Sequence, residues 1–315
     1  MKPKYFFAHH ARQLGTLAGL MGLCAVLWIL TPHFLTVSNL LNVAQQTAIN
    51  AIIAVGLTFV IISGGIDLSV GSIVAFSGVV LASLLQRVVP LPLALLAGLA
   101  TGLACGLVNG LLISFGRLPP FIATLGMMSV ARGAALLYTG GRPIAGFAEN
   151  FRWLATGEVL FVPAPVALMV VVYVFAHFVL GRTRFGRYVF AIGGNEEAAL
   201  LSGVPVRFHK AAVYAASGAL SGLAAVVLTA RLNSAQPIAG INYELDAIAA
   251  TVSGGTSLMG GQGSVVGTLI GALIMGVLRN GLNLLDVSSF VQQLVIGAVI
   301  ILAVLMDMAF KDQKR

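Results

Sequence analysis

The sequence predicts an all-α protein, a polytopic transmembrane bundle of about ten helices with both termini in the cytoplasm. Of its 315 residues, 58% are hydrophobic and only 9% are charged, and the mean hydropathy is +0.99. Soluble domains carry about 25% charged residues, so this chain cannot cover an ordinary water-facing surface. The apolar residues come in runs of roughly 17 to 24, the length at which a helix crosses a bilayer core of about 30 Å. A soluble enzyme, a secreted disulfide scaffold and a nucleic-acid-binding domain are therefore excluded.

Ten apolar runs are candidates for the membrane crossings. The runs at 245–258 and 264–280 share a glycine-rich hinge, so together they could be one crossing plus a broken or re-entrant piece. Nine or eleven spans are the alternatives to ten. We expect the first run to be a retained helix rather than a signal peptide, because Thr31-Pro32-His33-Phe34 stands where a signal peptide would have its small-residue cleavage site. The runs are 14–31, 43–63, 70–86, 91–115, 118–139, 160–180, 210–230, 245–258, 264–280 and 289–308.

The basic residues are divided unequally between the two sides of this topology. With the amino terminus inside, cytoplasmic segments hold 12 of the 18 basic residues and outer segments hold five, as the positive-inside rule requires. The membrane domain would cover 14–308, with cytoplasmic tails at 1–13 and 309–315. The 12 are Lys2, Lys4, Arg12, Arg117, Arg182, Arg184, Arg187, Arg207, Lys210, Lys311, Lys314 and Arg315, and the five are Arg87, Arg142, Arg152, Arg231 and Arg279. This distribution accounts for the net charge of +8 without a nucleic-acid partner.

The chain lacks the patterns typical of nucleotide, metal and redox sites. A phosphate-binding loop needs Gly-Lys, and no lysine of this chain follows a glycine. The histidines are scattered without the paired spacing of metal ligands. Cys24 and Cys105 both fall inside apolar runs, where packing rather than a disulfide is expected. We therefore expect no cofactor, no metal and no ATP hydrolysis by this chain itself.

Small residues at helical spacing predict close packing between helices. In the run 91–115, glycines repeat at every fourth position and form a flat stripe on one face. The runs 210–230 and 264–280 carry similar stripes. A minor alternative is that these stripes are sliding surfaces between two conformations. The residues are Gly98, Gly102, Gly106 and Gly110, then Ser217, Gly218, Ser221, Gly222 and Ala225, and finally Gly263, Gly267 and Gly271.

Two segments share the pattern S-G-G-x-x-L at the cytoplasmic ends of two predicted spans. They are 63–68 and 253–258. Transporters are often built from internal repeats, and a Gly-Gly break at two matching depths agrees with one, although six positions are too few to prove a duplication. In the first segment the glycines would hold a helix break that is capped by Asp67 or Ser69.

Ionisable groups near the apolar runs offer few sites for a coupled ion. The carboxylates all lie near span ends: Asp67, Glu244, Asp246, Asp286 and Asp307. No carboxylate is thus expected at the midplane, where proton and ion paths usually run, so a proton-coupled carrier is disfavoured and sodium coupling through carbonyl oxygens stays open. Arg132 is the one basic residue within a span. It either snorkels to the interface or faces an internal water-filled pathway and pairs there with a carbonyl or carboxylate.

The most informative segment is the basic loop 181–209, the largest on the cytoplasmic side. Residues 196–201 form helices readily, Asn195 is placed as their N-cap, and Gly203 is placed as a stop. A short capped helix on the membrane face is typical of a docking element. An ordinary solvated loop helix has the same pattern.

Several short motifs, including one in this loop, are similar to those of a known transporter family. Glu197-Ala198-Ala199-x-x-x-Gly203 resembles the E-A-A-x-x-x-G coupling loop of bacterial ABC importer permeases, although Val213-Tyr214-Ala215-Ala216 replaces the I-x-L-P of the maltose type. Other segments resemble, in order, the motifs of the ribose-type permeases over about 31–308. They are Gly64-Gly65-Ile66-Asp67-Leu68-Ser69-Val70-Gly71-Ser72, 120–128, Gly186-Arg187-Tyr188, Ser234-Ala235-Gln236-Pro237, 243–250 and 254–258.

The resemblance implies the permease subunit of a bacterial ABC importer for ribose or a similar monosaccharide, in the inner membrane. Its implied partners are a second permease copy, an ATP-binding cassette subunit, a sugar-binding protein outside the membrane, and lipid. Arg132 would be a candidate for the pathway. Coupling to the ATPase would rest on Gly194, Asn195, Glu196, Glu197, Ala198, Ala199 and Gly203, and a helix break near the pathway on Gly64, Gly65, Asp67, Ser69 and Gly71.

Two other functions stay open at this stage. Permeases for branched-chain amino acids or nucleosides share much of this architecture. An ion-coupled secondary carrier is the alternative from a different class, and a requirement for a partner ATPase would separate it from an ABC permease. Because its spans hold few polar groups, the chain is expected to bind sugar weakly and to leave recognition to the binding protein.

Overall fold

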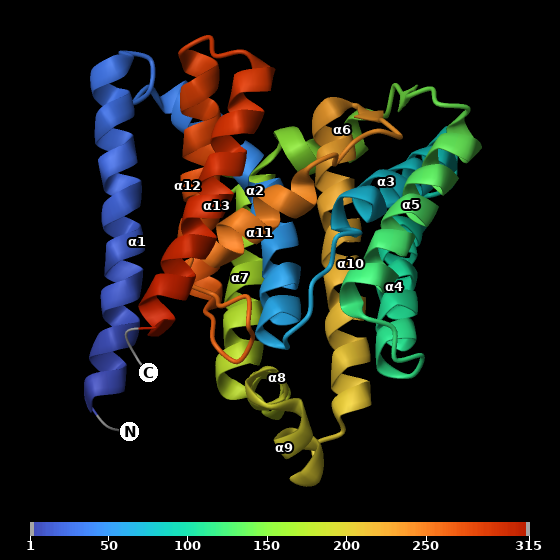
Figure 1. Ribbon diagram of the computed structural model, residues 1–315. Helices are drawn as coiled ribbons and strands as arrows, with labels where there is room; N and C mark the ends of the chain where they lie inside the picture. Colours follow the sequence, from blue (N-terminus) through green and yellow to red (C-terminus); the bar gives the residue numbers. More distant parts are fainter. Residues whose placement is uncertain (1–2, 313–315) are drawn as a thin grey trace.

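The computed structural model describes residues 3–312, with side chains from Leu14 to Leu305 except at position 303. The described part is a bundle of helices (Figure 1). Residues 1–2 and 313–315 of the proposed tails lie outside it. The helices are α1 Pro3–Leu30, α2 Val37–Ile62, α3 Val70–Gln86, α4 Leu91–Ser114, α5 Pro120–Thr139, α6 Glu149–Thr156, α7 Ala164–Arg182, α8 Arg184–Gly194, α9 Glu196–Leu201, α10 Val206–Leu232, α11 Tyr243–Ser253, α12 Val265–Leu284 and α13 Ser289–Asp312.

Six of these helices are long and apolar enough to cross a membrane: α2, α4, α5, α7, α10 and α12. Shorter apolar helical stretches occur in α1, in α3 and in the first part of α13. Each of the ten apolar runs coincides with a helix, because lipid leaves backbone groups no partner except those of their own helix. The prediction of a helical membrane protein is confirmed.

The run 245–258 is helical over only part of its length. Its helix, α11, has 11 residues and ends at Ser253, after which the chain is non-helical as far as Ser264. An 11-residue helix is about 16 Å long, roughly half of the bilayer core. A single helix over the whole of this run is therefore wrong, and the predicted glycine-rich hinge is a non-helical break between α11 and α12.

The long helices run roughly parallel and define two ends of the bundle. In Figure 1, α8 and α9 lie at one end, together with the first turn of α1 and the last turn of α13. The opposite end carries α6 and two pairs of two-residue strands. In these pairs β1 (Ile144–Ala145) lies antiparallel to β4 (Ser234–Ala235), and β2 (Glu158–Val159) lies antiparallel to β3 (Val162–Pro163).

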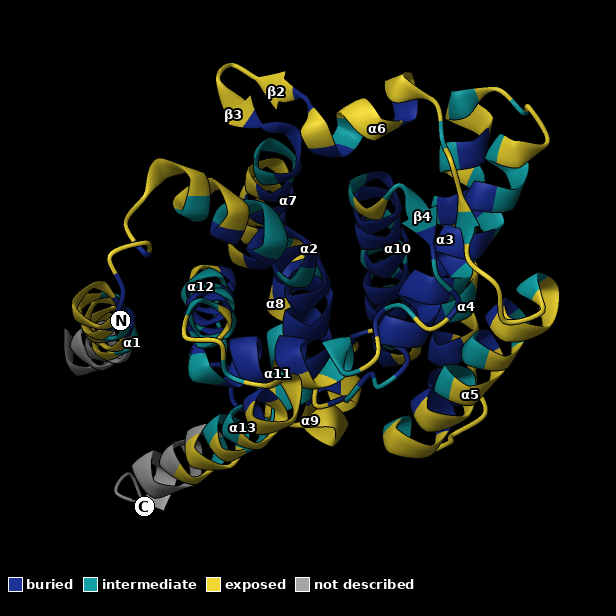
Figure 2. Ribbon diagram, turned by 90° about the horizontal axis from the view of Figure 1, so that it is seen from above, coloured by how far each residue is buried: buried dark blue, intermediate teal, exposed yellow. Residues whose placement is uncertain are grey.

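Helix α2 is the most buried of the six long apolar helices, with 83% of its most apolar window inside the protein. Figure 2 shows it near the centre, between α7, α10, α11 and α12. Its core positions include Ile52, Ile53 and Leu57, each at most 1% exposed. A helix that is apolar on every side belongs in such a core.

The predicted glycine stripes of α4 and α10 face each other. A Cβ atom added at Gly102 would lie 2.9 Å from the Cα of Gly222, and one at Gly106 would lie 2.9 Å from the Cα of Gly218. Only residues without a Cβ permit this approach, so the stripe on α4 is a packing surface as predicted. The stripe on α12 packs in the same way, because Gly271 lies against the carbonyl group of Ala250 in α11.

Candidate coupling site and polar interior

Helices α8 and α9 are joined at a single residue, Asn195. Its backbone is extended (φ −162°, ψ 106°), and its side-chain oxygen accepts a hydrogen bond from the Ala198 N–H at 2.9 Å. Helix α9 ends at Leu201; Gly203 follows with a φ of +81°, and the Val204 N–H bonds back to the Ala199 carbonyl at 3.1 Å. An N-cap and a left-handed glycine thus enclose one short helix. The predicted capped helix is confirmed, while its role in coupling stays a prediction.

Helix α9 turns apolar side chains away from the protein. Leu200 is 61% and Leu201 is 89% exposed, and Glu197 is exposed beside them, whereas Ala199 is buried against α8 and α10. The helix lies at the extreme end of the bundle in Figure 1. Exposed leucines at such a tip are typical of a surface that a partner covers.

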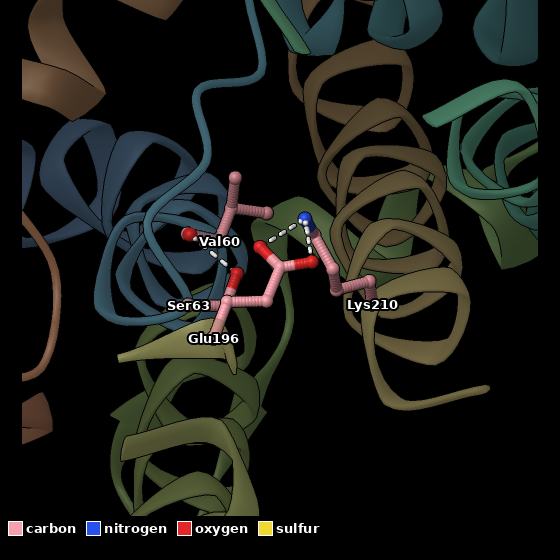
Figure 3. A network of polar contacts seen from close by, with 4 residues as sticks. All are labelled: Val60, Ser63, Glu196 and Lys210. Atoms are coloured by element: carbon pink, nitrogen blue, oxygen red, sulfur yellow. Dashed lines mark hydrogen bonds and ion pairs between the residues drawn. The ribbon is translucent and has the colours of Figure 1, made fainter. Parts of the chain in front are cut away.

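Glu196 faces α10 rather than the surface that carries the leucines. The Lys210 ammonium donates to both of its carboxylate oxygens, at 3.1 and 2.9 Å (Figure 3). The Lys210 side chain is only 16% exposed and that of Glu196 is 53% exposed. The two adjacent glutamates therefore differ, because Glu196 ties α9 to the bundle and Glu197 is presented outward.

The first helix break follows α2. The Gly64 N–H donates to the Ile61 carbonyl and the Gly65 N–H to the Val60 carbonyl, both at 2.9 Å, with Gly64 at φ +81°. A left-handed glycine of this kind closes a helix by satisfying its last carbonyl groups. The chain then turns back into the bundle in extended form and enters α3 (Figure 1).

Asp67 holds this extended segment inside the protein. One carboxylate oxygen accepts from the Ser69 N–H at 3.0 Å and from its hydroxyl at 2.6 Å, and the other accepts from the Ser217 hydroxyl of α10 at 2.8 Å. The Asn109 amide of α4 donates to the Ser69 hydroxyl at 2.9 Å. Of the two predicted caps, Asp67 bonds the N–H of Ser69, the residue before α3, and the Ser69 side chain bonds no N–H of the helix.

Two of the carboxylates that are expected near span ends are enclosed by protein. Asp67 is 0% and Asp246 is 2% exposed, and both lie in the interior. Asp67 lies inside because the chain turns back into the bundle after the first break, and Asp246 lies inside because α11 packs against α2 and α12.

The second helix break follows α11 with the same geometry. The Gly255 N–H bonds to the Val252 carbonyl at 2.8 Å and the Thr256 N–H to the Thr251 carbonyl at 3.1 Å, with Gly255 at φ +94°. Gly255 therefore corresponds to Gly64. The structural equivalence of the two segments is shifted by one residue from the S-G-G-x-x-L alignment.

Both breaks meet the end of α8 at a cluster of glycines, which we call the glycine junction: Gly64, Gly193, Gly194, Gly260 and Gly261. The Gly261 N–H donates to the carbonyl of Ile62 at 2.9 Å. A Cβ at Gly260 would lie 3.0 Å from the Cα of Gly64, and one at Gly261 would lie 2.9 Å from the Cα of Gly194. The structure thus brings the predicted coupling and helix-break residues together. Gly193, Gly260 and Gly261 were missed, and the signal that could have found them is the recurring Gly-Gly dipeptide.

Arg132 reaches from α5 to the chain ahead of α11. Its Nη1 donates to the carbonyl groups of Pro237 and Ala239, each at 2.7 Å. Next to them, Gly240 adopts φ +71° and packs directly on Gly71 at the start of α3. Pairing of Arg132 with carbonyl groups is confirmed, and its exposure to a water-filled pathway stays a prediction.

A buried ion pair links α11 to α12. Arg279 Nη2 donates to both oxygens of Asp246, at 2.8 and 2.7 Å, and the Asn50 amide of α2 lies 3.5 Å from the same carboxylate. Arg279 is one of the five basic residues predicted on the outer side, which stays a prediction, and 31% of its side chain is exposed. Sequence alone gave no signal that these two residues, 33 positions apart, would pair.

The comparisons with known proteins agree with the predicted resemblance. Residues 39–304 match the family described as "Branched-chain amino acid transport system / permease component". The ribose import permease protein RbsC of Escherichia coli (strain K12) is 51% identical over 308 residues, 96% of either chain. RbsC of Bacillus subtilis (strain 168) is 53% identical over 298 residues, 94% of this chain and 92% of the relative. The D-allose transport system permease protein AlsC of E. coli (strain K12) is 40% identical over 308 residues, 97% of this chain and 94% of the relative.

No solved structure matches this chain significantly. The family match begins in α2 and ends in α13, so it includes both helix breaks, α8 and α9. The resemblance to the ribose-type permeases rests on motifs in the same region and is confirmed. The chain belongs to this family of ABC importer permeases.

Proposed function

We propose that this chain is the transmembrane subunit of an importer for ribose or a similar monosaccharide, driven by ATP hydrolysis in a separate subunit. The observation that carries the proposal is the identity of 50% or more to ribose import permeases over nearly the whole chain. Identity to the allose and arabinose permeases is lower, at 40% and 39%. A permease for branched-chain amino acids is the second candidate, because the family description names that transport system.

The proposed topology has ten passes, with α8, α9 and both termini in the cytoplasm of a bacterial cell. Two of these passes are only partly helical. Helix α3 follows an extended segment, and α11 lies between two non-helical segments. Such segments are tolerated at membrane depth where protein surrounds them. Helices α8 and α9, the first turn of α1 and the last turn of α13 lie at the same end of the bundle (Figure 1), which supports this topology. The excess of basic residues in the segments proposed as cytoplasmic supports it as well.

Coupling would proceed from α9 to the glycine junction. In this proposal Glu197, Leu200 and Leu201 dock on the ATP-binding subunit, because they are exposed at the end of the bundle. Helices α8 and α9 meet at one residue, so a displacement of α9 moves Gly193 and Gly194. Those glycines contact both helix breaks without intervening side chains, and the displacement therefore reaches α3 and α12.

The proposed assembly contains two permease copies, the ATP-binding subunits and an external sugar-binding protein, in the lipid of the inner membrane. No glycine precedes a lysine in this chain, so the phosphate-binding loop must come from a partner. Weak binding of sugar by the permease favours its release inside the cell.

The test is to purify the tagged protein gently from membranes and to compare two glycine variants. Gly203→Val at the end of α9 should abolish uptake and retention of an ATP-binding subunit while membrane insertion persists. Gly140→Val is the matched control, because Gly140 also ends a helix with positive φ (+60° against +81°) and open space around it, but in α5. Glu197→Lys should act as Gly203→Val does.

Two outcomes contradict the proposal. Normal uptake by Gly203→Val and Glu197→Lys removes α9 from coupling. A solitary chain that moves ribose in vesicles without ATP is a secondary carrier, and the coupling scheme then fails as a whole.

A further inference from the structure

Helix α2 carries a polar stripe at the end of the bundle opposite α8 and α9. Asn42, Gln46 and Asn50 recur at every fourth position, so they lie on one face of the helix. None of the three is buried, although α2 is the most enclosed of the long apolar helices. A polar face on such a helix requires polar neighbours or water.

Three other helices supply polar side chains to this face. Arg231 of α10 donates to the Asn42 side-chain oxygen at 3.0 Å. Tyr243 and Asp246 stand together in the first turn of α11, and Arg279 of α12 pairs with Asp246. Together with the stripe these residues make up what we call the polar cluster: Asn42, Gln46, Asn50, Arg231, Tyr243, Asp246 and Arg279.

The polar cluster has unused hydrogen-bonding groups and space beside them. Arg279 contacts Asp246 through Nη2, and its other N–H groups have no partner among the described residues. The Thr47 hydroxyl is also unpartnered there, and Thr47 is only 2% exposed. Thr47, Gln46 and Asn50 line a cavity with Asp246 and Arg279 of about 10 Å³, the size of one water molecule.

We propose that the polar cluster lines the route of the sugar at the outer end of the bundle and binds its hydroxyl groups in passing. This inference rests on the proposed function. Ionisable groups within membrane domains are costly and usually mark substrate paths. One carboxylate, two guanidinium groups, three amides and a phenol can together donate to and accept from a polyhydroxylated, uncharged ligand.

Entry of a sugar requires the cluster to open, because the cavity now has room for water alone. Helix α11 carries two cluster residues, Tyr243 and Asp246, and lies between left-handed glycines at Gly240 (φ +71°) and Gly255 (φ +94°). Glycine turns at both ends allow a short helix to shift as a unit. The same shift reaches the glycine junction through the second break, so opening of the cluster is linked to α8.

The experiment measures protection of an introduced thiol by sugar. In a background in which Cys24 and Cys105 are replaced by serine, Asn50→Cys is placed in the cluster. Asn39→Cys is the control, since it lies on the same helix at similar exposure but pairs with Asn280 outside the cluster. The complete transporter in proteoliposomes, with its ATP-binding and sugar-binding partners, is labelled with N-ethylmaleimide with and without ribose and ATP.

Ribose with ATP should slow labelling at position 50 by about fivefold or more, because a bound ligand covers most of the surface it contacts. Labelling at position 39 should not change. Equal rates at position 50, in a transporter that imports ribose, overturn the inference and leave the proposed function standing. A parent complex that imports no ribose refutes the proposed function itself. If the first variant does not assemble, Gln46→Cys replaces it with the same expected protection.

Discussion

The two helix breaks share one backbone geometry but are anchored to the bundle in different ways. In the first, the Asp67 carboxylate accepts three hydrogen bonds, and α4 and α10 both take part in the network. The second break, 254–264, contains no charged residue, and the buried Thr256 hydroxyl has no partner among the described residues. With the one-residue shift between the breaks, Leu258 occupies the position equivalent to Asp67.

The difference indicates which break yields when α8 moves. Both contact Gly193, so both receive the same displacement. Breaking the first would leave buried polar groups unpaired, which costs about 1–3 kcal/mol for each group. The second break contacts α8 through backbone atoms and glycines, so moving it should cost less free energy than moving the first break. We therefore expect α11 and α12 to follow the coupling helix while α3 stays fixed to α4 and α10.

Asp67→Leu should lower stability more than any other change considered, because it removes the carboxylate that holds the first break in the bundle. The Ser69 N–H and the Ser217 hydroxyl would be left without an acceptor, at a total cost of about 3 kcal/mol or more. Thermal unfolding of the purified protein measures this loss. Leu258→Ala at the equivalent position should cost about 1 kcal/mol, since Leu258 is only partly buried. Equal losses would mean that the two breaks are anchored alike.

Gly193→Ala should come next, because the added methyl group would collide with the Ile62 carbonyl and lie 2.6 Å from the Gly261 nitrogen. We expect the Gly261–Ile62 hydrogen bond to break and stability to fall by roughly 1–3 kcal/mol. Uptake should be lost together with the contact. Gly194→Ala is the control for stability, because nothing lies within 4 Å of a methyl group there, and its unfolding temperature should not change. A stable, active Gly193→Ala protein would remove the junction from the coupling route.

Arg132→Met should loosen the chain that leads into α11 without touching either break. Two hydrogen bonds from a charged donor would be lost, at 2.7 Å each, and we expect a cost of about 2 kcal/mol. If α11 moves during transport, this variant should change the rate of uptake more than its affinity for the loaded binding protein. Unchanged uptake would show that transport does not depend on the hydrogen bonds between Arg132 and the segment before α11.

Glu196→Gln should have the smallest effect, because the Glu196 side chain is 53% exposed and water screens its pairing with Lys210. Surface ion pairs contribute about 0–1 kcal/mol and weaken with salt. We expect an unfolding temperature within about a degree or two of the parent, and normal uptake. A large loss of uptake would place Glu196 in direct contact with the ATP-binding subunit, as the motif resemblance implies.

Much of the architecture could be predicted from local patterns. Runs of apolar residues placed ten of the thirteen described helices, since a backbone in lipid has no other way to satisfy its polar groups. Asn195 and Gly203 predicted the bounds of α9, because caps act on neighbouring residues only. The predicted glycine stripe of α4 identified a packing face for the same reason.

The sequence by itself determined the class of protein, its helices, its family and the short helix at its end, all of which depend on composition or on neighbours along the chain. Only the tertiary structure decided what lies across the bundle. The pairing of Asp246 with Arg279, the burial of Asp67 and the meeting of Gly64, Gly193 and Gly260 depend on how far the chain turns back after each break. The hydropathy pattern cannot predict these contacts, because residues distant in sequence meet only when the whole bundle packs.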